Sequence, residues 1–345
     1  LIKFAIRSAR FTIAAAGLWA FSAGICGRAD CGEEIPLSRD TVIRFAGPQT
    51  GRRVLATRDK FMRSVSRFDV ESRLGKLNAT PDELLRFAAD QVLPWEAALQ
   101  AKIEPAVALI REKLARYKAR FPKEILLIRT TGKEEGGAAY CRGMNAIVLP
   151  AVVTDRRNQE QLARLLMHEL FHILSRSDQE ARRRLYGIVG FRECAEIAVP
   201  AALRDRKITN PDAPTLEHYI EIQLDGSSAK AVPLLYASVA RFDPEKGGTF
   251  FKYLTFRLMV VREVGGRWAA VMEGDEPRLI VPKDNQSFRK QIGGNTNYII
   301  HPDEILADNF VHLLTDAGQL QTPRIVEQMR RVLGGPPPRE PHDDR

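Results

Sequence analysis

The feature that most constrains this chain is an apolar pattern over residues 160–176 that carries two histidines. Apolar side chains recur there mostly at three- and four-residue spacing, which predicts a helix with one buried side. His168 and His172 would then project from the same face, one turn apart, where two imidazoles can bind a single metal ion. The apolar positions are Leu162, Leu165, Leu166, Phe171, Ile173 and Leu174.

Together with Glu169, the two histidines form the pattern His-Glu-x-x-His, in which each residue type has a chemical role. Zn²⁺ bound by neutral imidazoles keeps one position open for water and lowers the pKa of that water toward neutrality. Glu169 is placed to accept the proton as general base. With six histidines in the chain, a shuffled sequence would show the pattern on the order of once in a hundred times. A surface helix with two unrelated histidines is the less favoured interpretation, because the pattern lies inside a well-patterned apolar helix.

The net charge of the chain does not indicate a nucleic-acid partner. The 345 residues carry a formal charge of +9, but residues 1–29 hold four basic residues and no acid. The remaining basic residues are interspersed with acidic ones, without a basic tract rich in aromatic residues. We therefore predict no nucleic-acid site.

Residues 1–29 have the organisation of a targeting segment. A basic start precedes an apolar run over Phe11–Ile25, which is shorter than the roughly 20 residues of a membrane-spanning helix. We predict a signal peptide, cleaved near Ala23 or after Ala29, or an N-terminal anchor that associates with the membrane through residues 1–25 if it is not cleaved. Either case predicts an extracytoplasmic protein, periplasmic or secreted.

The cysteines show no metal-binding spacing. They are Cys26, Cys31, Cys141 and Cys194, none of them in a Cys-x-x-Cys pair. Cleavage after Ala29 would leave Cys31, Cys141 and Cys194. One disulfide among these three and buried free thiols are then equally compatible with the sequence.

Residues 30–120 are expected to form an N-terminal helical segment that packs on the core. Thr80-Pro81-Asp82-Glu83 is a helix start, with an N-cap residue, a proline and an acid three residues after the cap. Helices are expected at about 81–93 and 95–119, with a shorter one around 58–66.

A catalytic domain is expected over residues 121–333. Residues 124–130 form an apolar run typical of a buried strand, and residues 139–144 and 145–150 are expected to form a hairpin arm and an edge strand. Pro150 suggests that this last strand has a free side. Such an edge can hold an extended peptide through backbone hydrogen bonds, or it can be an ordinary sheet margin.

Residues 215–282 contain short β-rich runs separated by turn sequences such as Asp243–Gly248. This punctuation predicts an antiparallel β-meander inserted in the catalytic domain. A helix over 249–262 is the alternative for part of it. The glycine- and proline-rich tail, 334–345, is expected to be disordered.

A second informative stretch surrounds Glu304 and Asp308, which lie four residues apart on a predicted helix. Two acids so placed repel each other, so a cation or a partner group between them would explain why both are present. Metal-bound histidines usually donate their other ring nitrogen to a carboxylate. Glu304 as third ligand and Asp308 as the acceptor for His168 satisfy both requirements.

Three other acids compete with Glu304 for the third ligand position. Glu193 and Glu196 lie closer to His172 in the sequence, but neither has an aspartate four residues later. Asp178 would resemble a metzincin variant, although Ser175 stands where that family needs glycine.

An oxyanion forms when water attacks a carbonyl group, and a hydrogen-bond donor close to the metal is needed to stabilise it. We expect this donor to be Tyr298 or His301, just before the glutamate helix, although either can be a packing residue. His312 and His218 are expected to be core or rim residues.

Taken together, His168, Glu169, His172, Glu304 and Asp308 resemble the pattern of the gluzincins, the zinc peptidase clan that includes thermolysin. The departure is that 131 residues separate His172 from Glu304, far more than in thermolysin-like chains, and the predicted β insertion would account for them.

The resemblance implies an α+β fold with a zincin-like core, in which a mixed sheet is combined with an active-site helix and a glutamate helix. It also implies zinc held by His168, His172 and Glu304, and hydrolysis of peptide or protein substrates. The alternative function is an exported, metal-stabilised binding or envelope protein without turnover.

Overall fold

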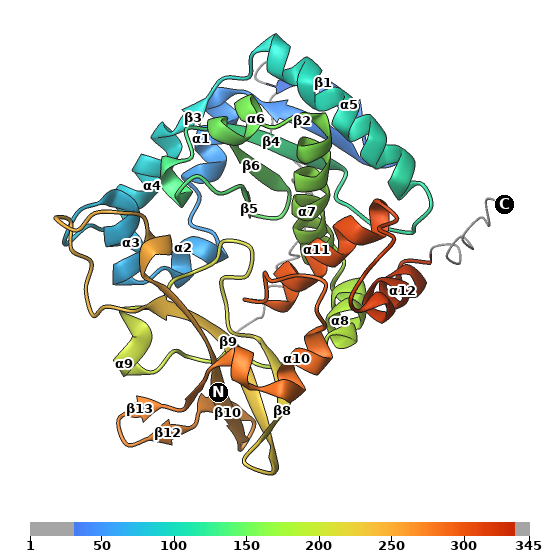
Figure 1. Ribbon diagram of the computed structural model, residues 1–345. Helices are drawn as coiled ribbons and strands as arrows, with labels where there is room; N and C mark the ends of the chain where they lie inside the picture. The colour runs from blue at the N-terminus through green and yellow to red at the C-terminus, as the bar shows by residue number, and fades with distance from the viewer. Residues whose placement is uncertain (1–30, 335–345) are drawn as a thin grey trace, which may run out of the picture.

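The computed structural model describes residues 31–334 and has an α+β fold built on two β-sheets (Figure 1). The first sheet lies in the upper half of Figure 1 and the second in the lower half, with helices α7 (Gln159–Ser177) and α11 (Pro302–Leu314) beside them. The predictions for the targeting segment and, apart from Gly334, for the tail lie outside the described residues.

The first sheet is mixed, with the strand order β1-β2-β4-β6-β5. Strands β2, β4 and β6 are parallel, whereas β1 and β5 pair antiparallel at the two margins, and the short β3 pairs with β4 beyond the end of β2. The strands are β1 (Cys31–Pro36), β2 (Val42–Ala46), β3 (Val92–Leu93), β4 (Glu124–Thr130), β5 (Tyr140–Arg142) and β6 (Ala146–Pro150).

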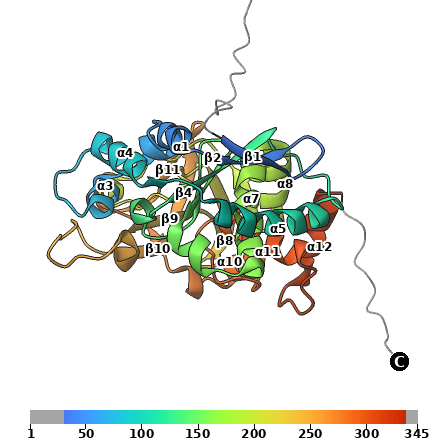
Figure 2. The same ribbon diagram turned by 90° about the horizontal axis from the view of Figure 1, so that it is seen from above.

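Strand β4 is apolar because both of its faces are covered, as is usual for a central parallel strand. Ile125 and Leu127 pack in the core that includes α5 (Ala97–Leu114) and α7. Leu126 and Ile128 point to the opposite core, which includes α1 (Pro48–Leu55) and α4 (Pro81–Asp90). Figure 2 shows α1 and α4 on one side of β4 and α5 on the other. The predicted strand over 124–130 is confirmed.

Two expectations about this sheet are wrong. The segment 30–120 is not only helical, because β1, β2 and β3 belong to the central sheet. The strand that ends at Pro150 is not an edge strand, because β6 lies between β4 and β5. Pro150 is tolerated there since it is the last residue of β6 and the N-cap of α6 (Ala151–Arg156), where φ is −63°. The free margin is β5.

The second sheet is an antiparallel meander with the order β11-β10-β9-β8-β7, and β14 pairs with β10. The strands predicted between 215 and 282 are therefore present. The alternative helix over 249–262 is wrong, because a short 3-10 helix (Phe250–Tyr253) leads into β10, which pairs with β9 over eight residues. The strands are β7 (Phe191–Glu193), β8 (His218–Leu224), β9 (Ser227–Ala237), β10 (Leu254–Val264), β11 (Arg267–Ala270) and β14 (Leu279–Ile280), with a separate pair β12 (Met272–Glu273) and β13 (Glu276–Pro277).

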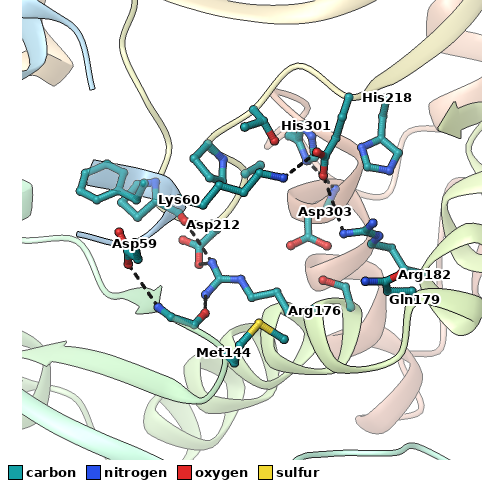
Figure 3. Close-up of a pocket in the computed structure, with 18 of the residues that line it drawn as sticks. Asp59, Lys60, Met144, Arg176, Gln179, Arg182, Asp212, His218, His301 and Asp303 are labelled. Carbon is teal, nitrogen blue, oxygen red and sulfur yellow. Dashed lines mark hydrogen bonds and ion pairs between the residues drawn. The ribbon is translucent and has the colours of Figure 1, made fainter. Parts of the chain in front are cut away.

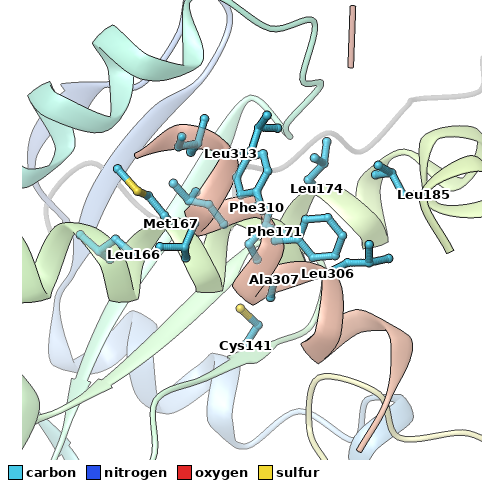
Figure 4. Close-up of a cluster of buried hydrophobic side chains, with 14 of the residues drawn as sticks. Cys141, Leu166, Met167, Phe171, Leu174, Leu185, Leu306, Ala307, Phe310 and Leu313 are labelled. Atoms are coloured by element: carbon cyan, nitrogen blue, oxygen red, sulfur yellow. The ribbon is translucent and has the colours of Figure 1, made fainter. Parts of the chain in front are cut away.

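Helices α7 and α11 pack against each other through apolar side chains that are almost inaccessible to solvent (Figure 4). The rings of Phe171 and Phe310 lie 5.6 Å apart at this contact. Among helices of residues 31–334, none is both long and apolar enough to cross a bilayer. The remaining helices are α2 (Lys60–Ser64), α3 (Arg67–Leu74), α8 (Gln179–Ile188), α9 (Ala201–Arg204), α10 (Gln286–Ile292) and α12 (Pro323–Val332).

Candidate metal centre

Helix α7 presents His168 and His172 on one face, as their spacing predicts. A capping box fixes the start of the helix: the Asn158 side chain accepts the N–H of Gln161, and the Gln161 side chain accepts the N–H of Asn158. The two imidazole centroids lie 4.9 Å apart. His172 is buried, with 1% of its side chain exposed, whereas 15% of the His168 side chain is exposed.

The Glu304 carboxylate from α11 lies between the two imidazoles. Its Oε2 atom is 3.1 Å from Nε2 of His168 and 3.5 Å from Nε2 of His172. Ligand bonds of about 2.0–2.1 Å in a tetrahedral site place the ligand atoms about 3.4 Å from one another. The donor set and its spacing therefore fit zinc.

Both histidines direct their second ring nitrogen to an aspartate of α11. Nδ1 of His168 lies 2.9 Å from Oδ1 of Asp308, the partner expected from the sequence. Nδ1 of His172 lies 2.7 Å from Oδ2 of Asp303, and the Tyr186 hydroxyl donates to the other Asp303 oxygen at 2.6 Å. Such contacts leave both Nε2 atoms for the ligand position.

None of the competing third ligands groups with the two histidines within the described residues. Asp178 accepts the N–H of Ala181 and caps α8. Glu193 pairs with Arg183 at 3.2 Å, and Glu196 is exposed. Within residues 31–334, Glu304 is the acid that groups with both histidines, with all three ligand atoms within 4.8 Å of one another.

The charges around this cluster alter how its members titrate. Burial lowers the pKa of His168, but the hydrogen bonds to Asp308 and Glu304 outweigh it and raise that pKa to about 10. The pKa of His172 is also raised, because nearby acids, Asp212 foremost, outweigh burial. A cation must therefore displace protons from this site, so the affinity for the cation is expected to decrease as the pH is lowered.

Glu169 is buried, with 2% of the residue exposed, and lines the same cavity as His168, His172 and Glu304. The Sγ atom of Cys141 lies 3.4 Å from its Oε2 atom. Burial, followed by the Asp212 charge, raises the pKa of Glu169 to about 7, against the lowering effect of His172. A carboxyl group with this pKa can accept and return a proton near neutral pH.

The thiols of Cys141 and Cys194 are both free, so these two cysteines do not form the disulfide considered from the sequence.

The segment Asn210–Asp212 also reaches the site, which the sequence did not indicate. The Asn210 amide donates to Oε1 of Glu304 at 2.5 Å. Oδ1 of Asp212 accepts the backbone N–H of Cys141 in β5 at 2.9 Å and lies 3.0 Å from Arg176. In the sequence, Asn-Pro-Asp carries only a turn signal, so nothing local reveals these contacts.

A cavity of about 470 Å³ is lined by His168, His172, Glu304 and Glu169 together with Tyr298. The Tyr298 ring is stacked beside His168 at 6.2 Å between centroids, and 43% of the residue is exposed. The Glu304 charge and then burial raise the pKa of its hydroxyl, which remains a hydrogen-bond donor. His312 lines the same cavity, in agreement with the expected rim position.

His301 does not join this cavity, contrary to the expected role as oxyanion donor. It is the N-cap of α11, where its Nδ1 atom accepts the N–H of Asp303 at 3.1 Å. Its ring lines a second cavity of about 550 Å³ together with His218 (Figure 3). The His301 ring lies beside the rings of Tyr186 and His218, with centroids 6.0 and 6.1 Å apart.

Comparison of the chain with protein-family models, curated proteins and solved structures finds no match. The interpretation of the site therefore depends on its geometry and on the sequence pattern.

Proposed function

We propose that this protein is a zinc-dependent peptidase with a zincin-like core. The observation that carries the proposal is the convergence of two Nε2 atoms on one Glu304 oxygen, while both Nδ1 atoms are held by carboxylates. The arrangement of His168, Glu169, His172, Glu304 and Asp308 supports the gluzincin resemblance of the sequence.

The proposed metal ligands, Glu169 and Tyr298 each have a place in hydrolysis. A zinc ion held by His168, His172 and Glu304 would supply Lewis-acid activation of water and of the scissile carbonyl. Glu169 accepts the proton of the attacking water and delivers it to the leaving amine. The Tyr298 hydroxyl is a hydrogen-bond donor in the cavity that can stabilise the developing oxyanion.

A peptide is the substrate that the surroundings of the cavity favour. Ala138 and Ala139, which lead into the marginal strand β5, line the cavity beside the metal ligands. Extended peptides bind at such margins through backbone hydrogen bonds, which places a scissile amide close to Glu169.

The test is zinc content and peptide hydrolysis of the dialysed protein and three variants. We expect one zinc per wild-type chain and hydrolysis of a mixed peptide library. Glu304→Ala should lose zinc, whereas Glu169→Gln should keep zinc and lose hydrolysis. Glu196→Gln, an exposed former candidate, is the matched control and should keep both. A wild-type protein that holds zinc, binds a partner and hydrolyses nothing would instead support the metal-stabilised binding protein.

A further inference from the structure

Two arginines, Arg157 and Arg164, line the proposed catalytic cavity. Arg164 lies on α7 one turn before His168, so the two side chains leave the same face of the helix. Arg157 directly follows α6 and precedes the N-cap of α7. The cavity therefore combines the metal ligands with two guanidinium groups.

Neither guanidinium has an intramolecular partner among residues 31–334. By contrast, three arginines of β4, β5 and α7 are each paired with a carboxylate. These pairs are Arg129 with Asp155 at 3.1 Å, Arg142 with Asp59 at 2.8 Å, and Arg176 with Asp212 at 3.0 Å. Arg157 and Arg164 thus differ from these three in being uncommitted charges at the cavity.

The acids of the same cavity do not neutralise them. Asp308 binds His168, Glu304 binds both histidines and Asn210, and Asp212 binds Arg176. Glu169 is buried beside Cys141. A group that enters the cavity would therefore meet paired acids and two unpaired guanidinium groups.

We propose that Arg157 and Arg164 bind a carboxylate of the substrate and make the proposed peptidase selective for peptides with a carboxylate close to the scissile bond. A guanidinium group offers a planar pair of N–H donors that matches a carboxylate. The carboxylate can come from the C-terminus of the peptide or from an Asp or Glu side chain close to the scissile bond. This selectivity rests on the proposed function.

The test compares peptides that differ only in charge. One pair carries a C-terminal carboxylate or amide, and the other an internal Glu or Gln beside the scissile bond, so the two pairs distinguish the sources of the carboxylate. We expect the wild type to cleave the acidic member of at least one pair at least tenfold more efficiently. Arg157→Ala and Arg164→Ala should each raise KM for that member about tenfold with little change in kcat.

Arg156→Ala is the matched control, because Arg156 is an exposed neighbour that does not line the cavity. It should leave both pairs unchanged. Equal cleavage within both pairs by the wild type would overturn the proposal. So would a loss that is the same for the acidic and neutral members, or the same in Arg156→Ala.

Binding of the same peptides to zinc-treated Glu169→Gln protein, measured by calorimetry, separates this inference from the proposed function. A tenfold preference for an acidic peptide that disappears in Arg157→Ala/Arg164→Ala would support the carboxylate site even if the wild type hydrolysed no peptide. Hydrolysis without any such preference would support the peptidase and overturn the carboxylate site.

Discussion

The Nδ1 atom of His172 lies 2.7 Å from Oδ2 of Asp303, the residue directly before the proposed ligand Glu304. Helix α11 therefore provides a carboxylate for the ligand position and two others, Asp303 and Asp308, that orient the histidines of α7. The orientation of both imidazoles thus depends on one helix that packs directly against theirs.

Asp303→Asn should weaken zinc binding, because the neutral amide no longer holds the N–H of His172 through a charge. We expect a 10- to 100-fold loss of affinity, measured by competition with a chelator of known affinity. Tyr186→Phe removes only the hydroxyl on the other Asp303 oxygen and should cost less. Unchanged zinc affinity in Asp303→Asn would show that this contact does not support the site.

Zinc should stabilise the fold, because the proposed ligands join α7 to α11. At free zinc 100 times the dissociation constant, the free energy of unfolding should rise by about 2.7 kcal/mol. Urea unfolding with and without a chelator measures this change. His168→Ala/His172→Ala should show no such gain, and an equal gain in that variant would place the stabilising zinc elsewhere.

Acid should destabilise the protein through His218, both of whose ring nitrogens are buried without a partner among the described residues. Burial, then the charges of His301 and Arg182, lower its pKa to about 3, against Glu217 and Asp303. The unfolded chain, with a pKa near 6.5, binds more protons between these values. The contribution of His218 to stability is therefore fully present above about pH 6.5. Below that pH, the free energy of unfolding falls by about 1.4 kcal/mol per pH unit.

The measurement is the free energy of unfolding in urea at several pH values between 7 and 5. His218→Phe should flatten the slope by about one proton. His301, whose pKa is lowered to about 4 mainly by burial, would retain its own contribution. An unchanged slope in His218→Phe would contradict the assignment.

Arg73 should be important for stability, because its buried guanidinium lies 2.7 Å from Asp69 and 2.5 Å from Glu135. Arg73→Met leaves two buried carboxylates without their partner and should cost about 3–5 kcal/mol of unfolding free energy. Arg67→Met removes a solvent-exposed pair of the same helix, Arg67–Asp205 at 3.4 Å, and should cost less than about 1 kcal/mol. Similar costs for both variants, measured in urea, would contradict this difference.

Strong local patterns made part of this structure predictable. Helix α7 occupies 159–177, close to the predicted 160–176, because its apolar stripe and its cap act within one segment. The prediction that Glu304 lies near the histidines, 131 residues after His172, came from chemistry, since two acids four residues apart on a helix repel each other. The structure places Glu304 Oε2 within 3.5 Å of both Nε2 atoms.

The missed features depend on tertiary contacts. Strand β2 is only five residues long, and its place is decided by pairing with β4. Asn210 and Asp212 have no spacing relation to the histidines. His301 is close to Glu304 in sequence, but the turn into α11 directs its ring elsewhere.

The contact between Asp212 and the N–H of Cys141 has a consequence for the length of any peptide that adds to β5. At Cys141 that hydrogen-bond donor is already taken, so an added strand can extend along the margin only up to this residue. Further extension would require expulsion of a carboxylate that Arg176 holds in place. The margin is therefore closed at one end, and a chain terminus or a sharp bend fits there better than a continuous polypeptide.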